Sequence, residues 1–376
     1  MRILYFSDNG SDHNRRFLEQ LSAFGHDVCF LDITQEEIAE NWLPRGVRRV
    51  QASQRVRRNA DPNQFAEFLP EFQFWLKELR PDLVHAGPVQ TCGYVAALSS
   101  FHPLVVMSWG SDMLVHANRN AEWRCATEIA LRAADGFFCD CDTVRECAQA
   151  YLAIPNSRIV QFPWGIKRGS FSPHGPAEPR ERLGLSPEAF AFISTRAWEP
   201  LYDTEVLLQA FHRAYRENHR LRLLLLGHGS AAGRVRSFIA EHQLNQVVVV
   251  PGVIAGKETP RWFRAANAYV SCARSDGTSI SLLEAMATGL PAVVTDIASN
   301  REWIAEDENG WLASAGSSGE FAAKLLRAAS LPPNDLEAIS ERNQRIVAER
   351  ADWDKNFPSL LRLYECLMNS ALVAEA

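Results

Sequence analysis

The chain has few lysines, scattered cysteines and no long apolar run. Only five of its 39 basic residues are lysine, and the other 34 are arginine. No apolar stretch reaches the roughly 18 residues of a membrane-spanning helix. The opening residues MRILYFSDNG are too short for the apolar core of a signal peptide. These absences predict a cytoplasmic protein.

The eight cysteines lack the paired spacing of a zinc site and the density of a disulfide scaffold. Reduced thiols are therefore expected. The segment CDCD at 139–142 contains an Asp-x-Asp, which in some nucleotide-sugar enzymes holds a divalent metal. Because an apolar run precedes it and a helical pattern follows, we favour Asp142 as a helix N-cap. No metal is expected.

The net charge limits the possible functions, and the chain length indicates the number of domains. A net charge of −6 and a pI near 6.0 argue against a nucleic-acid binder, which usually carries a basic excess. A chain of 376 residues exceeds the size at which one core stops growing, so two domains are expected.

Short apolar runs alternate with helical patterns along almost the whole chain, which is typical of parallel sheets with crossover helices. A stretch rich in proline and glycine interrupts this alternation and resembles a linker. The sequence thus predicts two Rossmann-like α/β domains, and an amphipathic helix at the end. Their ranges are 1–165, the linker 166–187, then 188–351 and the tail 352–376.

The segment SDGTSISLLEAMATGLPAVV, residues 275–294, predicts a loop, a helix from Ile280 to Thr288, a turn at Gly289 and a buried strand. A helix N-terminus presents unpaired N–H groups and partial positive charge. The loop Gly277, Thr278, Ser279 together with Ile280 would therefore suit a phosphate or diphosphate.

These residues resemble the retaining GT-B glycosyltransferases of family four, over nearly the whole chain. The segment is similar to the family's Glu-x7-Glu motif, with Asp276 first and Glu284 second. GHGS from Gly227, VVPGVI around Val253 and NREWIAEDENGWL are similar to three further family segments. The resemblance implies two Rossmann-like domains facing across a cleft, with the C-terminal helix crossing back to the N-terminal domain. It also implies a UDP-sugar or GDP-sugar donor, and no cofactor.

The resemblance implies that Glu284 accepts hydrogen bonds from both ribose hydroxyls of the donor. The alternative is a capping box between Ser281 and Glu284, which needs no ligand. Asp276 would face the donor sugar and act in catalysis; an Asx turn into Gly277 is its alternative. Gly227 and Val253 are placed on the donor side by the same resemblance.

STRAWEPLYD resembles the family's Arg-x4-Lys, whose two cations neutralise the leaving diphosphate. Arg196 fits the first position, and a solvated surface charge is the alternative. The lysine is missing, because Leu201 or Tyr202 stands there. Either the Tyr202 hydroxyl donates, or Lys257 substitutes, or the leaving group is stabilised less.

In the N-terminal half, VVMSWGSDML resembles the family's His-Gly-Thr-Asp stretch, with Trp109 in place of the histidine beside the donor sugar. Core filling is the alternative for Trp109. Asp112 is retained and is assigned to catalysis. Gly10 resembles part of a glycine loop near the phosphates. His13 and His85 are given no role.

Six arginines between Arg45 and Arg58 could attract an anionic or lipid-linked acceptor, or a peripheral contact with the inner membrane face. A solvated loop is the alternative. The hypothesis is a retaining glycosyltransferase of cell-surface polysaccharide or glycolipid biosynthesis. An epimerase on the same fold and a catalytically silent nucleotide-sugar binder are its rivals.

Overall fold

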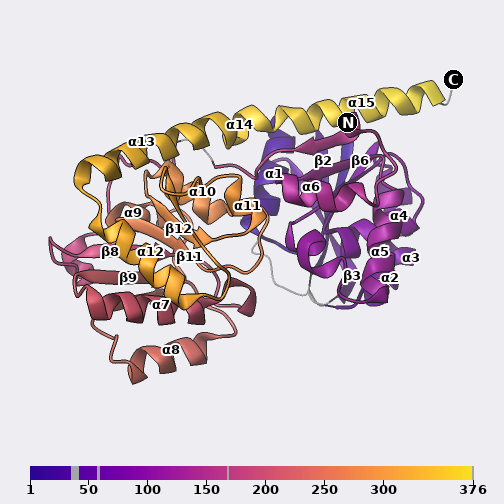
Figure 1. Ribbon diagram of the computed structural model, residues 1–376. Helices are drawn as coiled ribbons and strands as arrows, with labels where there is room; N and C mark the ends of the chain where they lie inside the picture. Colours follow the sequence, from indigo (N-terminus) through magenta and orange to yellow (C-terminus); the bar gives the residue numbers. More distant parts are fainter. Residues whose placement is uncertain (35–41, 57–59, 167–168, 375–376) are drawn as a thin grey trace. The chain divides into compact units, whose positions relative to one another are not determined.

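A computed structural model describes residues 1–34, 42–56, 60–166 and 169–374 of the chain (Figure 1). The chain forms two compact units. The first contains Met1–Trp164 and Asp354–Ala376, and the second contains Gly165–Trp353. The segment 166–187, predicted as a linker, belongs to the second unit, where Leu185 is part of the apolar core.

The first unit is built on a parallel seven-stranded sheet with the order β3-β2-β1-β4-β5-β6-β7. Its strands are β1 (Arg2–Ser7), β2 (Asp27–Thr34), β3 (Val47–Val56), β4 (Leu83–Ala86), β5 (Leu104–Met107), β6 (Gly136–Cys139) and β7 (Ile159–Gln161). Its helices are α1 (Asp12–Ala23), α2 (Pro62–Ala66), α3 (Leu69–Leu79), α4 (Tyr94–Leu98), α5 (Ala121–Arg132), α6 (Asp142–Gln149), α14 (Trp353–Asn356) and α15 (Pro358–Ala374), with the helical turns η2 (Val89–Gly93), η3 (Asp112–His116) and η4 (Asn156–Arg158). Trp353, at the start of α14, is grouped with the second unit.

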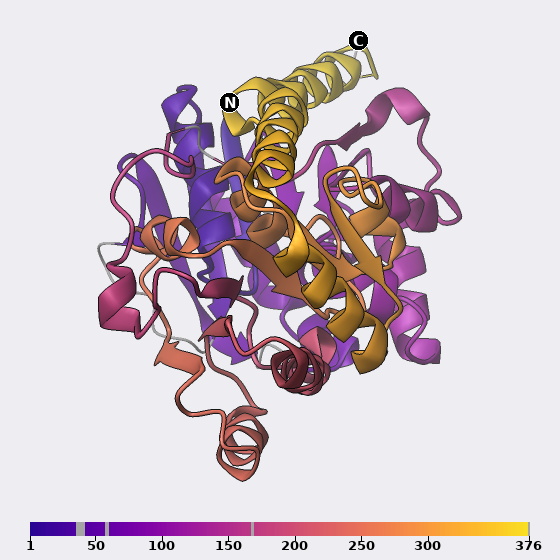
Figure 2. The same ribbon diagram turned by 60° about the vertical axis from the view of Figure 1, so that its left-hand side comes forward.

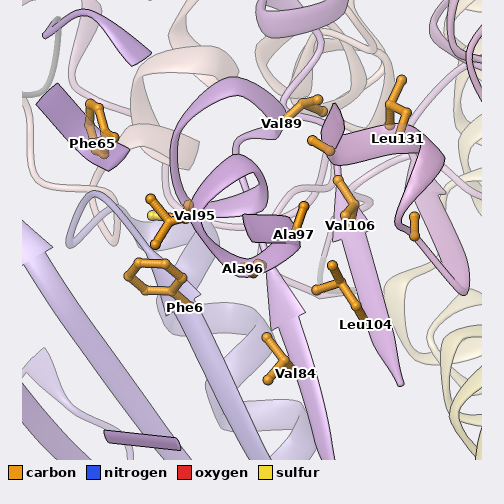
Figure 3. Close-up of a cluster of buried hydrophobic side chains, with 14 of the residues drawn as sticks. Phe6, Phe65, Val84, Val89, Val95, Ala96, Ala97, Leu104, Val106 and Leu131 are labelled. Carbon is orange, nitrogen blue, oxygen red and sulfur yellow. The ribbon is translucent and has the colours of Figure 1, made fainter. Parts of the chain in front are cut away.

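Alternate side chains of these strands enter two different apolar layers, as the period of two in a strand requires. Phe6, Val84 and Val106 face one layer, where Val95 of α4 lies beside Phe6 (Figure 3). Tyr5 and His85 point to the opposite face. All of these side chains are buried, which is typical of a parallel sheet covered on both faces.

The C-terminal helix α15 packs on the first unit, against β6 and β7. Its apolar stripe includes the buried Leu360, Leu363 and Leu367. A Cβ at Gly136 would lie 3.0 Å from Leu363, so the helix approaches the strand closely there. The prediction that the tail joins the N-terminal domain is confirmed.

The second unit has a parallel six-stranded sheet with the order β10-β9-β8-β11-β12-β13. Its strands are β8 (Phe190–Ser194), β9 (Leu221–Leu226), β10 (Val248–Gly252), β11 (Ala268–Ser271), β12 (Ala292–Thr295) and β13 (Gly310–Ala313). Its helices are α7 (Thr204–Glu217), α8 (Ala232–Glu241), α9 (Thr259–Ala265), α10 (Ile280–Ala287), α11 (Ala298–Arg301), α12 (Ser318–Ser330) and α13 (Pro333–Arg350), with the turns η5 (Arg180–Leu183) and η6 (Pro200–Tyr202).

Helices cover both faces of this second sheet. The helices α7 and α12 lie side by side on one face, and α10 packs against α13 on the other (Figures 1 and 2). The leucines of β9 serve both layers, because Leu223 and Leu225 enter the first and Leu224 enters the second. This explains why the strand has no polar alternation.

The structure corrects one detail of the CDCD segment. Asp142 is the first residue of α6 and forms an ion pair with Arg145, while Cys141 occupies the N-cap position. The N-cap prediction for Asp142 is therefore wrong by one residue. Among the described residues, no group of three or more His, Cys, Asp or Glu side chains could hold a metal ion.

Candidate functional site

The candidate site of the second unit lies where the order of its strands reverses. Successive strands run outward from β8 in one direction and from β11 in the other. In open parallel sheets, ligands bind outside the carboxyl ends of the strands at such a switch point. Arg196 follows β8 and Asp276 follows β11, so both lie at this position.

The helix α10 begins at this point, with Ser279 as its N-cap. The Ser279 hydroxyl accepts a hydrogen bond from the N–H of Leu282. The helix ends before Gly289, whose φ of +84° favours glycine. The loop and helix prediction for this segment is therefore confirmed. The capping box is wrong, because Ser281 lies inside the helix.

Three side chains lie against the guanidinium of Arg196. Its Nη1 donates to the hydroxyls of Ser279 at 3.0 Å and Ser281 at 3.3 Å. Its Nη2 lies 2.8 Å from Oδ2 of Asp276. The Arg196 side chain is only 13% exposed, so the alternative of a solvated surface charge is wrong.

One donor of the same guanidinium, Nε, is left for another partner. Nε of Arg196 is buried and has no hydrogen-bond partner among the described residues. Nε and Nη2 lie on one edge of the planar group, and this fork matches two phosphate oxygens. Leaving a buried donor unpaired costs about 1–3 kcal/mol, which an incoming anion would recover.

Opposing influences act on each group of the Arg196–Asp276 ion pair. Burial disfavours the Arg196 cation, but Asp276, Tyr202 and Tyr269 together outweigh it, so the pKa of Arg196 lies above its ordinary value. Burial raises the pKa of Asp276, although Arg196 and the Gly277 N–H lower it in part. The Asx turn considered for this residue stays a prediction.

Of the candidates for the missing lysine, Tyr202 lies on Arg196. Its ring is 4.0 Å from the guanidinium carbon, a distance typical of a cation–π contact. The carbonyl of Leu201 accepts from the Arg274 N–H instead. Lys257 is exposed and forms no ion pair with any described residue, and Val253 is 78% exposed. Lys257 and Val253 stay predictions as donor contacts.

Gly227 lies next to the backbone of Arg196. A Cβ at Gly227 would lie 2.9 Å from the Arg196 carbonyl oxygen, and its φ of +112° also favours glycine. The loop can therefore cross the end of β8 at close range.

Glu284, half-buried about one turn into α10, lies on the same helix as the cap. Its bond to ribose stays a prediction, and so do ligand contacts of Thr278 and Ile280.

Two residues of this site were not predicted from the sequence. Ser281 was considered only as a cap, and Tyr269 of β11 was not singled out. The Tyr269 hydroxyl lies 2.7 Å from the Ser281 hydroxyl. A tyrosine inside a fully buried strand is a usable signal, because its buried hydroxyl needs a partner.

In the first unit, Asp112 organises its own loop. It is 3% exposed, and it accepts hydrogen bonds from Ser108 at 2.7 Å and from the N–H groups of Trp109, Met113 and Val89. Burial raises the pKa of Asp112, and these hydrogen bonds oppose the shift. Its catalytic assignment stays a prediction, and the observed geometry is that of a residue that positions the loop.

Trp109 lies beside a second tryptophan rather than in the apolar core. It is half-buried, its ring centroid is 4.3 Å from that of Trp164, and the indole N–H of each is buried without a partner among the described residues. The alternative that Trp109 simply fills the core is therefore wrong.

Gly10 lies in the loop between β1 and α1, and its phosphate contact stays a prediction.

Part of the arginine-rich segment forms the edge strand β3, so Arg48 and Arg49 do not lie in a loop, while Arg45 lies in the turn before it. Arg48 pairs with Asp27, and Arg49 pairs with the buried Asp32. Arg57, Arg58 and the side chain of Arg55 lie outside the described residues. None of the helices in the described ranges is long and apolar enough to cross a bilayer.

Comparisons with known proteins cover both units. A family model described as glycosyl transferases group 1 matches residues 188–330, and one described as glycosyl transferase 4-like matches residues 2–141. A D-inositol 3-phosphate glycosyltransferase of Pseudarthrobacter chlorophenolicus is 24% identical over 275 residues, which are 71% of this chain and 65% of the relative. The chain spans between 38% and 65% of the length of the first curated relatives.

Two solved structures are similar over nearly the whole chain. Sucrose-phosphate synthase of Thermosynechococcus elongatus has a TM-score of 0.83 and 17% identity, with 98% of this chain and 99% of that chain covered. Anabaena Alr3699/HepE in complex with UDP and glucose has a TM-score of 0.80 and 17% identity, with 98% and 100% covered. These likenesses show the GT-B fold.

Proposed function

Because the chain belongs to the glycosyl transferases group 1 family, we propose that it transfers a sugar from a nucleoside diphosphate sugar to a hydroxyl acceptor, with retention of configuration. The observation that carries this proposal is Arg196. A buried cation at the N-terminus of α10, whose Nε has no partner in the described ranges, suits a departing diphosphate.

The reaction needs no strong base in this scheme. The bond between the anomeric carbon and the diphosphate breaks, and its electron pair goes to the phosphate oxygen. The acceptor oxygen bonds to the same face of the carbon, and its proton goes to the departing diphosphate. Arg196 and the N–H groups of α10 stabilise the growing negative charge, so this chain contributes positioning and fixed electrostatics.

Glu284 binds the ribose diol in this proposal, and no metal takes part. UDP is the favoured nucleotide, because HepE was solved with UDP. An anionic acceptor is supported by the name of the inositol phosphate relative. The arginines of β3 support it less than the sequence implied, since Arg48 and Arg49 already face aspartates. Polysaccharide or glycolipid biosynthesis, near the inner membrane face, is the proposed context.

A donor screen followed by product analysis tests this function. We expect UDP-sugars to raise the melting temperature more than GDP-sugars, because ligands that bind only the folded state stabilise it. The product should keep the anomeric configuration of the donor, as read by NMR. A changed sugar without any acceptor would indicate an epimerase. Tight binding without turnover on a broad acceptor panel would indicate a silent binder.

A further inference from the structure

A series of hydrogen-bonded hydroxyl groups, those of Tyr269, Ser281 and Ser279, leads to Arg196. Tyr269 is fully buried on β11, opposite Ile193 of the neighbouring strand β8. Its hydroxyl lies 2.7 Å from that of Ser281, which also accepts from Nη1 of Arg196. Ser281 and Ser279 are 3.2 Å apart. This series of hydroxyl groups thus connects β11 and α10 with Arg196, which follows β8.

The buried Tyr269 hydroxyl has a specific use in this arrangement. A buried hydroxyl is costly unless it is hydrogen-bonded. Burial raises the pKa of Tyr269, so the group is a neutral hydroxyl that can donate to Ser281. Ser281 then keeps one lone pair for Arg196, while the two lone pairs of Ser279 accept from Nη1 of Arg196 and from the Leu282 N–H. Every hydroxyl in this series has a partner.

Arg196 needs such support because the second cation of the family's Arg-x4-Lys motif is missing from this sequence. Leu201 or Tyr202 stands at that position, and Lys257 is exposed with no ion-pair partner among the described residues. A free arginine side chain carries about 2 kcal/mol of rotamer entropy, which is lost when it must point at a ligand. Contacts that fix the guanidinium in advance remove that cost from the reaction.

We infer that Tyr269 and Ser281 are positioning residues, which hold Arg196 with its Nε edge ready for the diphosphate of the donor. The inference rests on the proposed function and extends it to two side chains in contact with each other beside Arg196. Both act through Arg196, so their effect should disappear when Arg196 is removed.

A kinetic double-mutant cycle tests this dependence. Tyr269→Phe and Ser281→Ala should each lower kcat for donor cleavage by about 3- to 10-fold, the range for one lost hydrogen bond. The Kd for UDP, measured by calorimetry, should change less. In an Arg196→Ala background, either substitution should change kcat by less than about twofold, because residues that act as a unit are not additive.

Tyr215→Phe is the matched control, since it removes a tyrosine hydroxyl from α7 of the same unit. It should leave kcat unchanged in both backgrounds. Equal losses from Tyr269→Phe with and without Arg196 would overturn the inference, because Tyr269 would then act through the fold. A parent protein that binds no UDP and cleaves no nucleotide sugar would contradict the proposed function and the inference together.

Discussion

Arg196 illustrates how one side chain can hold two kinds of partner. Its Nη1 and Nη2 lie against two serines and Asp276, while its Nε has no hydrogen-bond partner within the described part of the chain. The negative charge of Asp276 reduces the net charge offered to an anion, but it also fixes the guanidinium in place. An interaction that strengthens as charge develops contributes to turnover more than to ground-state binding.

Arg196→Ala should therefore lower kcat by about 100-fold or more, the scale for loss of one preorganised stabilising group. Arg196→Lys should recover only part of this, because an ammonium lacks the bidentate fork. Steady-state kinetics on both variants measures the effect, with Arg236→Ala on the exposed side of α8 as the control. A kcat within a few-fold of the parent would remove Arg196 from the mechanism.

Glu284→Gln should weaken UDP binding by roughly 1 to 3 kcal/mol, because an amide offers one acceptor oxygen where the ribose diol needs two. Since Ser279 rather than Ser281 caps α10, the substitution should not disturb the cap. Calorimetry with UDP gives the affinity, and Glu337→Gln on α13 is the control. Unchanged affinity in a folded variant would show that Glu284 does not bind ribose.

At the scale of elements, β4 and α15 are joined by a buried polar contact. Nδ1 of His85 is hydrogen-bonded to the Tyr364 hydroxyl, and Nε2 of His85 has no partner among the described residues. Burial lowers the pKa of His85 to about 3, so the imidazole is neutral in the folded protein. In acid, His85 therefore takes up a proton only when the protein unfolds, and this proton uptake favours the unfolded state.

The sign of this effect predicts a pH dependence. Between the unfolded pKa of 6.5 and about pH 3, only the unfolded state binds the proton at His85. Stability should fall with decreasing pH by up to about 1.4 kcal/mol per unit from this residue. His85→Phe should flatten the dependence in urea unfolding, whereas Tyr364→Phe should keep it. An equal slope in parent and His85→Phe would contradict the assignment.

At the scale of the whole molecule, the chain returns to its first unit at the end. Phe357, Leu360 and Tyr364, which belong to the C-terminal segment Asp354–Ala376, are fully buried. Burial of each such side chain contributes about 1.5–3 kcal/mol, and a typical folded protein is stable by only about 5–15 kcal/mol. The C-terminal segment is therefore part of the core of the first unit.

Truncation after Arg350 should accordingly unfold or aggregate the first unit, and nucleotide-sugar turnover should be lost. Circular dichroism and size-exclusion chromatography would detect the change, with a chain ending at Val373 as the control that keeps the buried stripe. A soluble, fully active protein ending at Arg350 would show that α15 is dispensable.

The amino-acid sequence alone determined the local structure and the fold class of this protein. The helix from Ile280, its end before Gly289 and the apolar stripe of the tail follow from spacing and turn residues, which are local properties. The two sheets follow from the alternation of strands and helices. The resemblance of its motifs to those of a known family singled out Arg196, Asp276 and Glu284.

Only the tertiary structure decided which side chains meet. Ser279 rather than Ser281 caps α10, Tyr202 rather than Lys257 lies on Arg196, and Tyr269 supports Ser281 from a neighbouring strand. The physical reason is that hydrogen bonds and ion pairs depend on distance and direction within a few tenths of an ångström. Residues 73 or more positions apart, such as Arg196 and Tyr269, reach that geometry only when β8 and β11 pair.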